Sequence, residues 1–266
     1  MELAICSFAS SSAGNSFLIQ SQSTRILADI GISAKKTEES LAACGLSCVE
    51  LDGIVLTHEH IDHVRGIGTL LAKKPYRGPV FTTRGTCESV AQKYPQTEGK
   101  QFEIVRSGDH FFVGDIEVNV FRISHDAAEP VGYNVFSGEK KITLATDIGH
   151  VTDTIRESIE DSDVLLLEAN HDVEMLKKGG YPWSLKQRIL GENGHLSNHT
   201  AGRLLAEVMT GKMKYVFLGH LSEENNNPHL AYETVEEILR NNRIEVGTHV
   251  KMDMASRFQN GVKVEL

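Results

Sequence analysis

The sequence predicts a layered α/β fold, with β-sheets inside and helices outside. Strand-like apolar runs dominate the first half of the chain, whereas strand and helix patterns alternate in the second half. Several of these strands are apolar almost throughout, which indicates that they are covered on both faces. No linker rich in Pro, Ser or Gly and no fixed-period repeat divides the 266 residues, so we expect one domain over residues 1–266.

The individual elements follow from two periodicities. Runs enriched in β-branched and aromatic residues predict strands at residues 17–19, 25–27, 53–57, 80–83, 116–123, 131–136, 142–145, 164–167 and 215–218. Apolar residues three and four positions apart predict helices at residues 36–44, 64–73, 86–93, 151–160, 200–209 and 230–241. A chain of this length buries roughly 70–75% of its unfolded surface, so its folding needs no disulfide or metal.

Composition and charge exclude several classes of protein. The net charge of −9, from 27 basic and 36 acidic residues, argues against a simple cationic binder of nucleic acid or membranes. The start of the chain lacks a basic segment, and no run of 18 apolar residues could span a bilayer. The four cysteines form no Cys-x-x-Cys pair and are expected to stay reduced. We therefore expect a cytoplasmic protein without a membrane partner.

A cluster of potential metal ligands follows the predicted strand at 53–57. The segment reads His58-Glu59-His60-Ile61-Asp62-His63. His58 and His60 lie two positions apart and can point the same way, whereas Asp62 and His63 lie past the turn and can face a second ion. A lone buried histidine is usually a core residue, but imidazole and carboxylate groups at this density suit zinc or a related divalent ion.

Three other predicted strands end in residues of the same type. His125 follows the strand at 116–123, Asp147 follows 142–145, and His220 follows 215–218. Ligand sites of open α/β sheets lie at the carboxyl ends of strands. The repetition therefore predicts one shared site.

This motif set resembles the metallo-β-lactamase superfamily over essentially the whole chain. The resemblance implies a four-layer αββα sandwich with a two-metal centre and an acidic bracing residue, here Asp29. Flavodiiron relatives usually carry Glu in the position of His60, which favours a hydrolase. In this chain the resemblance assigns one ion to His58, His60 and His125, the other to Asp62, His63 and His220, and the bridging position to Asp147.

Two divalent ions, Zn²⁺ or Mn²⁺, would lower the pKa of a bridging water, so that a hydroxide could attack a phosphodiester. The leaving oxygen then needs a proton. By similarity to the tRNA-processing phosphodiesterases of the superfamily, Glu168 would orient His195, the general acid, and Asp62 is a further predicted catalytic residue. Those enzymes have His before the Glu, where this chain has Leu167. His195 could instead have a structural role. For His171, a catalytic role and a structural or ligand-supporting role both stay open.

Two further segments bear on the substrate. The small residues at 10–16 would let backbone amides and hydroxyls approach a phosphate, with Ser12 and Asn15 as candidates, unless this is only a flexible turn. Residues 177–188 carry four basic side chains and the only Trp of the chain. Lys186 and Arg188 are candidate phosphate contacts there, and a solvated basic loop is the alternative.

The size of the chain limits which subgroup of the superfamily it can resemble. Only 73 positions separate Asp147 from His220, which leaves no room for the inserted domain of β-CASP nucleases. The segments Ser-Ser-Ala-Gly-Asn-Ser, Glu-Ala-Asn-His-Asp and Gly-His-Leu-Ser-Asn together resemble the bacterial YycJ (WalJ) subgroup. That resemblance implies a 5′-to-3′ exonuclease on double-stranded DNA. The alternatives are a hydrolase of a small ester, lactone or thioester, and a metal-binding regulatory module linked to cell-wall two-component signalling. A homo-oligomer remains open.

Overall fold

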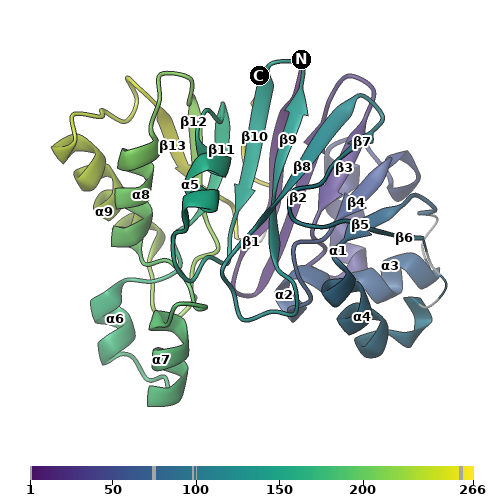
Figure 1. Cartoon of the computed structure of the whole chain (residues 1–266), viewed down its shortest axis with the longest axis horizontal. Coiled ribbons are helices and arrows are strands. Elements are labelled where there is room, and N and C mark those ends of the chain that lie inside the picture. The colour runs from purple at the N-terminus through teal and green to yellow at the C-terminus, as the bar shows by residue number, and fades with distance from the viewer. Residues whose placement is uncertain (1, 74–75, 98, 100, 258–259) are drawn as a thin grey trace.

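The computed structural model describes residues 2–73, 76–97, 99, 101–257 and 260–266, and it shows two seven-stranded sheets packed face to face. Helices lie outside both sheets, as Figure 1 shows. The predicted α/β class and the αββα layering are confirmed. The first and last strands, β1 and β14, pair in the same sheet, so both ends of the chain lie at one end of the sandwich (Figure 1).

The first sheet has the strand order β14-β1-β2-β3-β4-β5-β6. Its members β3 to β6 run parallel, while β14, β1, β2 and β3 pair antiparallel. Helices α1 (Ala34–Ala43), α3 (Ile67–Lys73) and α4 (Arg84–Lys93) cover its outer face (Figure 1). The strands are β1 (Ala4–Ser11), β2 (Gly14–Gln20), β3 (Arg25–Ala28), β4 (Gly53–Val55), β5 (Val80–Thr82), β6 (Phe102–Ile104) and β14 (Lys263–Glu265).

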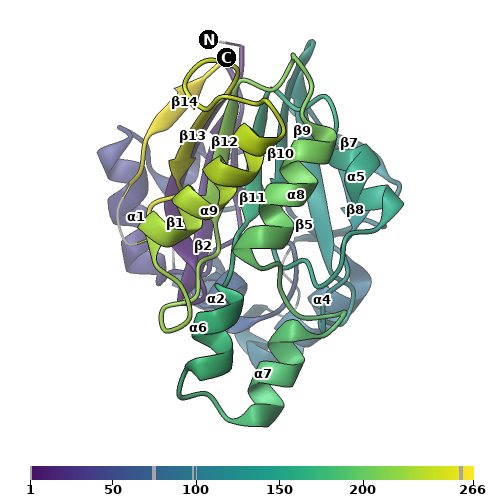
Figure 2. The ribbon, with the colours of Figure 1, turned by 90° about the vertical axis from the view of Figure 1, so that its left-hand side faces the viewer.

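The second sheet has the strand order β13-β12-β11-β10-β9-β8-β7. It is antiparallel from β7 to β10 and parallel from β10 to β13. Helices α5 (Asp153–Ile159), α8 (Asn198–Val208) and α9 (Pro228–Asn241) lie on its outer face (Figure 2). The strands are β7 (His110–Val113), β8 (Ile116–Arg122), β9 (Val131–Ser137), β10 (Lys140–Ala145), β11 (Val164–Glu168), β12 (Tyr215–Gly219) and β13 (Lys251–Met254).

The apolar strands are buried on both faces, as their composition predicts. In β11, Leu166 belongs to the core between the two sheets, whereas Leu165 and Leu167 belong to the core under α5, α8 and α9. All five residues of this strand are buried. A third core lies between the first sheet and its helices. The sheets are thus held rigidly from both sides, and so are the strand ends that carry the site.

The helices differ from the predicted pattern in two places. The predicted helix at 64–73 is interrupted, because α2 (Ile61–Val64) ends before Gly66, and α3 begins after it. The amide of Gly66 donates to the carbonyl of Ile30 at 2.9 Å, and a Cβ at Gly66 would lie 2.4 Å from the carbonyl oxygen of Ile32. This close approach ties the ligand segment after β4 to the chain after β3.

The second difference is at 177–188, where a basic loop is one of the two predicted alternatives. The structure has two short helices instead, α6 (Val173–Lys178) and α7 (Trp183–Leu190), which form a hairpin that projects from one end of the sandwich (Figures 1 and 2). Two 3₁₀ turns complete the elements, at Cys48–Glu50 and Pro95–Thr97. In the part of the chain that the structure describes, no helix is both long and apolar enough to cross a membrane.

Candidate metal centre

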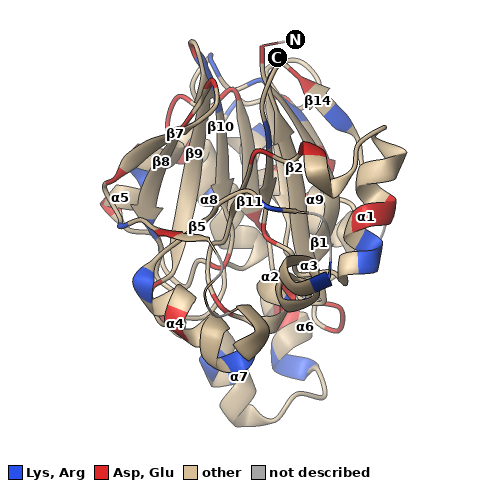
Figure 3. Ribbon diagram, turned by 90° about the vertical axis from the view of Figure 1, so that its right-hand side faces the viewer, with Lys and Arg blue, Asp and Glu red and all other residues tan. Residues whose placement is uncertain are grey.

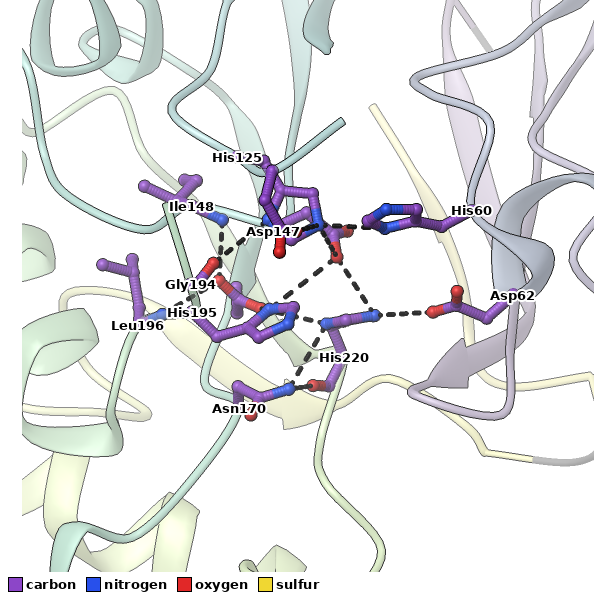
Figure 4. A network of polar contacts seen from close by, with 12 residues as sticks. His60, Asp62, His125, Asp147, Ile148, Asn170, Gly194, His195, Leu196 and His220 are labelled. Atoms are coloured by element: carbon purple, nitrogen blue, oxygen red, sulfur yellow. Dashed lines mark hydrogen bonds and ion pairs between the residues drawn. The ribbon is translucent and has the colours of Figure 1, made fainter. Parts of the chain in front are cut away.

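The first ligand set consists of His58, His60 and His125, whose ring nitrogens lie within 4.8 Å of one another. His58 and His60 follow β4, and His125 follows β8. Nδ1 of His125 faces the carbonyl oxygen of Gly194 at 3.1 Å, so its Nε2 points towards His60, whose Nδ1 lies 3.1 Å away (Figure 4). The structure thus brings together the three residues expected to hold one ion.

The second ligand set consists of Asp62, His63 and His220, again within 4.8 Å of one another. Oδ2 of Asp62 lies 3.1 Å from Nε2 of His220 and 3.5 Å from Nε2 of His63. Asp62 and His63 belong to α2, and His220 directly follows β12. Residues 158 positions apart in the chain therefore converge from the two sheets.

Asp147 lies between the two sets. Its carboxylate and the rings of His58 and His63, one from each set, form a further group within 4.8 Å. Oδ2 lies 3.2 Å from Nε2 of His63, and Oδ1 lies 3.4 Å from Nε2 of His220 and 3.7 Å from Nε2 of His125. Asp147 has a φ of 61° and His220 a φ of 56°, a region that non-glycine residues adopt at a cost of about 1–3 kcal/mol. This strain aims both side chains into the centre.

The buried polar atoms fit divalent cations. Nε2 of His58 is buried and has no hydrogen-bond partner among the described residues, and Oδ2 of Asp147 makes no hydrogen bond there beyond its 3.2 Å ion-pair contact with Nε2 of His63. Unpaired buried polar atoms are costly, so their presence in the middle of seven ligand-type side chains indicates a ligand that the protein itself does not supply. Five imidazoles and two carboxylates are the donor types of two-metal hydrolase sites.

The charges in the cluster favour cation binding. Burial alone would raise the pKa of Asp147, but His220 and His63 hold it well below its usual range, so the carboxylate is ionised. Burial and the neighbouring His63 lower the pKa of His58, which leaves that ring neutral and able to bind a metal. Burial would also lower the pKa of His63, but the carboxylates of Asp147, Asp29 and Asp62 raise it. Without cations, this carboxylate charge is balanced by protons on imidazoles.

Asp29 braces the centre from behind, as the resemblance implies. Its Oδ2 lies 2.7 Å from Nδ1 of His63 and accepts from the hydroxyl of Thr57 at 2.9 Å, and its Oδ1 accepts from the amide of Thr57. Carboxylates that hold the far nitrogen of a ligating histidine fix the orientation of the ring and raise its basicity. Thr57 was not predicted as a site residue, although it ends the predicted strand directly before His58.

Glu168 is buried and holds two histidines at once, His195 and His220, which Figure 4 shows side by side. Its Oε1 lies 2.7 Å from Nδ1 of His195 and 2.9 Å from Nδ1 of His220. Its Oε2 accepts from the amides of Ile148 and Leu196. Burial would raise its pKa, but His195 and His220 lower it to about 2, so Glu168 is a permanent anion at the bottom of the site. The contact with His220 was not anticipated.

His195 and His171 lie in different surroundings. The side chain of His195 is 14% exposed, and its Nδ1 is taken by Glu168, so Nε2 is the nitrogen that is left to face a substrate. His171 is buried, and neither ring nitrogen has a partner among the described residues. Burial lowers its pKa to about 4, against the opposing effect of Glu168, so the ring is neutral at pH 7. Asn170, beside it, donates to the carbonyl of His220 at 2.9 Å.

The residues near the start of the chain occupy two strands and a short turn. Asn15 lies on β2, is fully buried, and places Nδ2 3.0 Å from the carbonyl of Ser11 and 3.1 Å from Nε2 of His63. It therefore borders the second ligand set from inside. Ser12 is exposed in the turn between β1 and β2, and its amide approaches the carbonyl of Leu221 at 3.3 Å, next to His220.

The basic candidates of the α6–α7 hairpin separate into two kinds. Lys186 is buried, and its ammonium donates to the carbonyls of Lys177 and Gly179 at 2.7 Å, so it holds the hairpin together rather than facing a phosphate. Arg188 is half-exposed and forms a two-pronged ion pair with Asp126, the residue after His125. Figure 3 shows that α6 and α7 carry basic residues at the end of the molecule where α2 lies. Arg188 thus remains as a candidate beside the centre.

Comparison with known proteins agrees with this geometry. Residues 24–220 match the family model of the beta-lactamase superfamily domain. The chain is 38% identical over 239 residues to the protein "Exodeoxyribonuclease YycJ" of Bacillus anthracis, which covers 90% of each chain. It is also 38% identical over 246 residues to "Exodeoxyribonuclease WalJ" of Streptococcus pneumoniae strain D39, which covers 92% of this chain and 91% of the relative. A Zn²⁺-bound structure of PqqB from Methylobacterium extorquens has the same fold, with a TM-score of 0.72, 16% identity, and coverage of 99% and 100% of the two chains.

Proposed function

The chain belongs to the metallo-β-lactamase superfamily, in its YycJ/WalJ subgroup, and we propose that it is a two-metal exonuclease that degrades double-stranded DNA from the 5′ end. The observation that carries the proposal is the position of Asp147 between two three-residue ligand sets, directly beside a histidine that a buried carboxylate holds in place.

Two divalent ions, Zn²⁺ or Mn²⁺, would be held by the seven residues of the two sets and Asp147. When bound, such ions activate a water and neutralise the charge that develops on the phosphoryl group. The nitrogen-rich donor set suits Zn²⁺, and the carboxylates also permit Mn²⁺. Asp62 contributes to catalysis as a ligand whose neighbours keep it ionised, because His63 and His220 lower its pKa against the effect of burial.

The departing oxygen of a phosphodiester must gain a proton. Since Nδ1 of His195 donates to the carboxylate of Glu168, Nε2 is the nitrogen of this ring that is positioned to supply it. A positioned histidine contributes typically about 10²–10⁴-fold to such a step. Glu168 is a positioning residue, because it acts through His195 and His220.

The two curated relatives are named for activity on DNA and match this chain over nine-tenths of its length, which supports DNA as the substrate. With a net charge of −9, the chain must bind DNA through local contacts rather than through a general positive field. Arg188, which pairs with the residue after His125, is one such contact in the proposal, and the exposed Ser12 is a second. Asn15 is fully buried against His63, so it can support that ligand but cannot reach DNA. We place the activity in one domain in the cytoplasm.

The test is digestion of a duplex that carries a label at either the 5′ or the 3′ end, with metal-loaded protein whose metal content has been measured. Rapid release of the 5′ label as mononucleotide, with slow loss of the 3′ label, is expected. The matched control is Asp147→Asn, which removes one charge at nearly constant shape. Failure on DNA, RNA and bis(p-nitrophenyl) phosphate would overturn the proposal.

Two further measurements separate the alternatives. Hydrolysis of a lactone or thioester without cleavage of any phosphodiester would identify a small-ester hydrolase. A cellular role that survives Asp147→Asn would favour a metal-binding regulatory module, because that substitution removes the shared carboxylate.

A further inference from the structure

A pocket of about 480 Å³ lies beside the metal centre, on the side of His125. Its walls come from the segments after β8 and β10, which also carry His125 and Asp147, and from Asn193, two residues before His195. None of the residues predicted from the sequence explains this pocket, apart from His125. Its volume lies within the range of about 300–1,000 Å³ that is usual for small-molecule sites.

The walls of the pocket are of two kinds. The apolar part includes Ala127 and Pro130, and the polar part includes Arg122, His150 and Thr154. Such a lining suits a molecule with flat apolar faces and polar edges, which is the chemistry of a nucleoside. A purely aliphatic ligand would leave the polar groups without partners.

Two of the polar groups are available to a ligand. Arg122 is exposed at the end of β8 and lines the pocket, and none of the ion pairs within the described ranges of the chain involves its guanidinium. Nδ1 of His150 donates to the carbonyl of Glu192 at 2.8 Å, so its Nε2 is left over. The hydroxyl of Ser124 is different, because it already donates to the carbonyl of His150 at 2.6 Å and holds this wall in place.

The pocket and the centre share one structural wall. His125 lines the pocket and also faces His60 through Nε2. The carbonyl of Gly194 fixes the His125 ring, and the following residue is His195. A phosphate bound beside His125 would therefore lie close to this pocket, because one residue belongs to both sites.

We propose that the pocket binds the nucleoside of the nucleotide adjacent to the cleaved phosphodiester, with Arg122 as the main polar contact. This inference rests on the proposed nuclease function. A nucleoside held there would fix the position of the DNA end relative to Asp147, because the pocket is lined by the segments that follow β8 and β10, which also carry His125 and Asp147.

The first test measures binding and not turnover. Metal-loaded protein is titrated with deoxyadenosine 5′-monophosphate and, separately, with inorganic phosphate, since the two share the phosphate and differ by the nucleoside. We expect the nucleotide to bind at least about tenfold more tightly, and Arg122→Ala to reduce this preference about tenfold, the size of one charged hydrogen bond. Arg122→Lys should restore part of it.

Two further variants make the test specific. Thr154→Trp places a large ring at the rim from an exposed position of α5 and should reduce nucleotide binding while phosphate binding and metal content persist. Arg240→Ala removes the same charge from the exposed end of α9 and should change nothing. Equal affinity for nucleotide and phosphate would contradict nucleoside binding in the pocket. An equal loss of nucleotide affinity in Arg122→Ala and Arg240→Ala would contradict it as well.

Failure of the pocket and failure of the proposed function give different results. If the unaltered protein cleaves duplex DNA but shows no preference for the nucleotide over phosphate, the nuclease function stands and the proposed nucleoside binding in the pocket is wrong. If it binds the nucleotide through Arg122 but cleaves no DNA, the nuclease proposal is wrong and the site takes a free nucleotide. On DNA, Arg122→Ala is expected to act on KM more than on kcat.

Discussion

Oxygen Oε1 of Glu168 lies 2.9 Å from Nδ1 of His220, although Glu168 is expected from the sequence only to orient His195. The same oxygen lies 2.7 Å from Nδ1 of His195. One buried carboxylate therefore fixes a metal ligand and the proposed proton donor. Metal binding and proton donation can therefore be separated by a substitution at His195 but not by one at Glu168.

His195→Ala is expected to lower kcat on duplex DNA by about 10²–10³-fold, because the leaving oxygen loses its proton donor. Metal content should stay unchanged, since His195 belongs to neither ligand set. Steady-state kinetics with elemental analysis check both statements. The matched control is His199→Ala, an exposed histidine four residues later on α8. A His195→Ala variant with full activity would point to ester or lactone chemistry instead.

Glu168→Gln is expected to lower both activity and metal affinity. An amide oxygen cannot serve as an anionic partner for two imidazoles, so the ring of His220 loses its fixed orientation along with that of His195. Loss of such partners typically costs about 10–100-fold in metal affinity or activity. Competition with a chelator measures the first effect. Retention of metal affinity with loss of activity alone would show that His220 is fixed by Asn170 and the backbone.

Asp29→Asn is expected to weaken metal binding by about 10–100-fold. Asp29 belongs to neither ligand set, but its carboxylate lies 2.7 Å from Nδ1 of His63 and fixes that ring. Metal titration of the metal-free protein gives the affinity. Asp52→Asn is the control: Asp52 also accepts a backbone hydrogen bond between strands, from the amide of Arg25, but it lies at the other end of β3. Equal affinities in the two variants would contradict the bracing role.

Removal of the metals by a chelator is expected to lower Tm by roughly 10 °C. A ligand at 1,000 times its Kd stabilises the folded state by about 4 kcal/mol. A change of 1 kcal/mol moves Tm by about 2–4 °C in a chain of this size. Differential scanning calorimetry with and without chelator tests this, and restoration by added Zn²⁺ or Mn²⁺ is the control. An unchanged Tm after demonstrated metal loss would show that metal binding does not stabilise the folded state.

Asp115 links two turns at the opposite end of the sheets and gives a prediction on pH. Its carboxylate accepts from the hydroxyls of Ser21 at 2.7 Å and Ser23 at 2.8 Å, and also from Thr24. These hydrogen bonds lower the pKa of Asp115 from 3.8 to about 2, and the one from Thr24 has the largest effect. Because the folded state holds the ionised form, the stabilisation is complete above pH 3.8 and is lost as the pH falls through about 2.

Asp115→Ala is therefore expected to lower the free energy of unfolding by about 1 kcal/mol at pH 7, a value reduced for the exposure of the group. The difference from the unaltered protein should shrink between pH 4 and pH 2. Urea denaturation at these pH values measures it, with Asp109→Ala as the control in the neighbouring turn. A difference that is the same at pH 7 and pH 2 would show that the effect is not electrostatic.

The sequence was most informative at strand ends. Strand 53–57 followed by four ligand-type residues, and His125, Asp147 and His220 after three other strands, sufficed to predict one site, because strand direction fixes where carboxyl ends meet. Continuous apolar runs such as β11 also predicted the layers, since only a strand covered on both faces can be apolar throughout. These signals are local and repeat along the chain.

Other features were decided only by the tertiary structure. Lys186 is basic in sequence, but folding of the α6–α7 hairpin turns its ammonium onto two carbonyls, whereas Arg188, two positions on, reaches Asp126. The pocket beside His125 is formed by segments that are distant in sequence, and Glu168 meets His220 across 52 positions. Local patterns determine the type and ends of an element, but the partners of a polar side chain depend on which distant segments pack beside it.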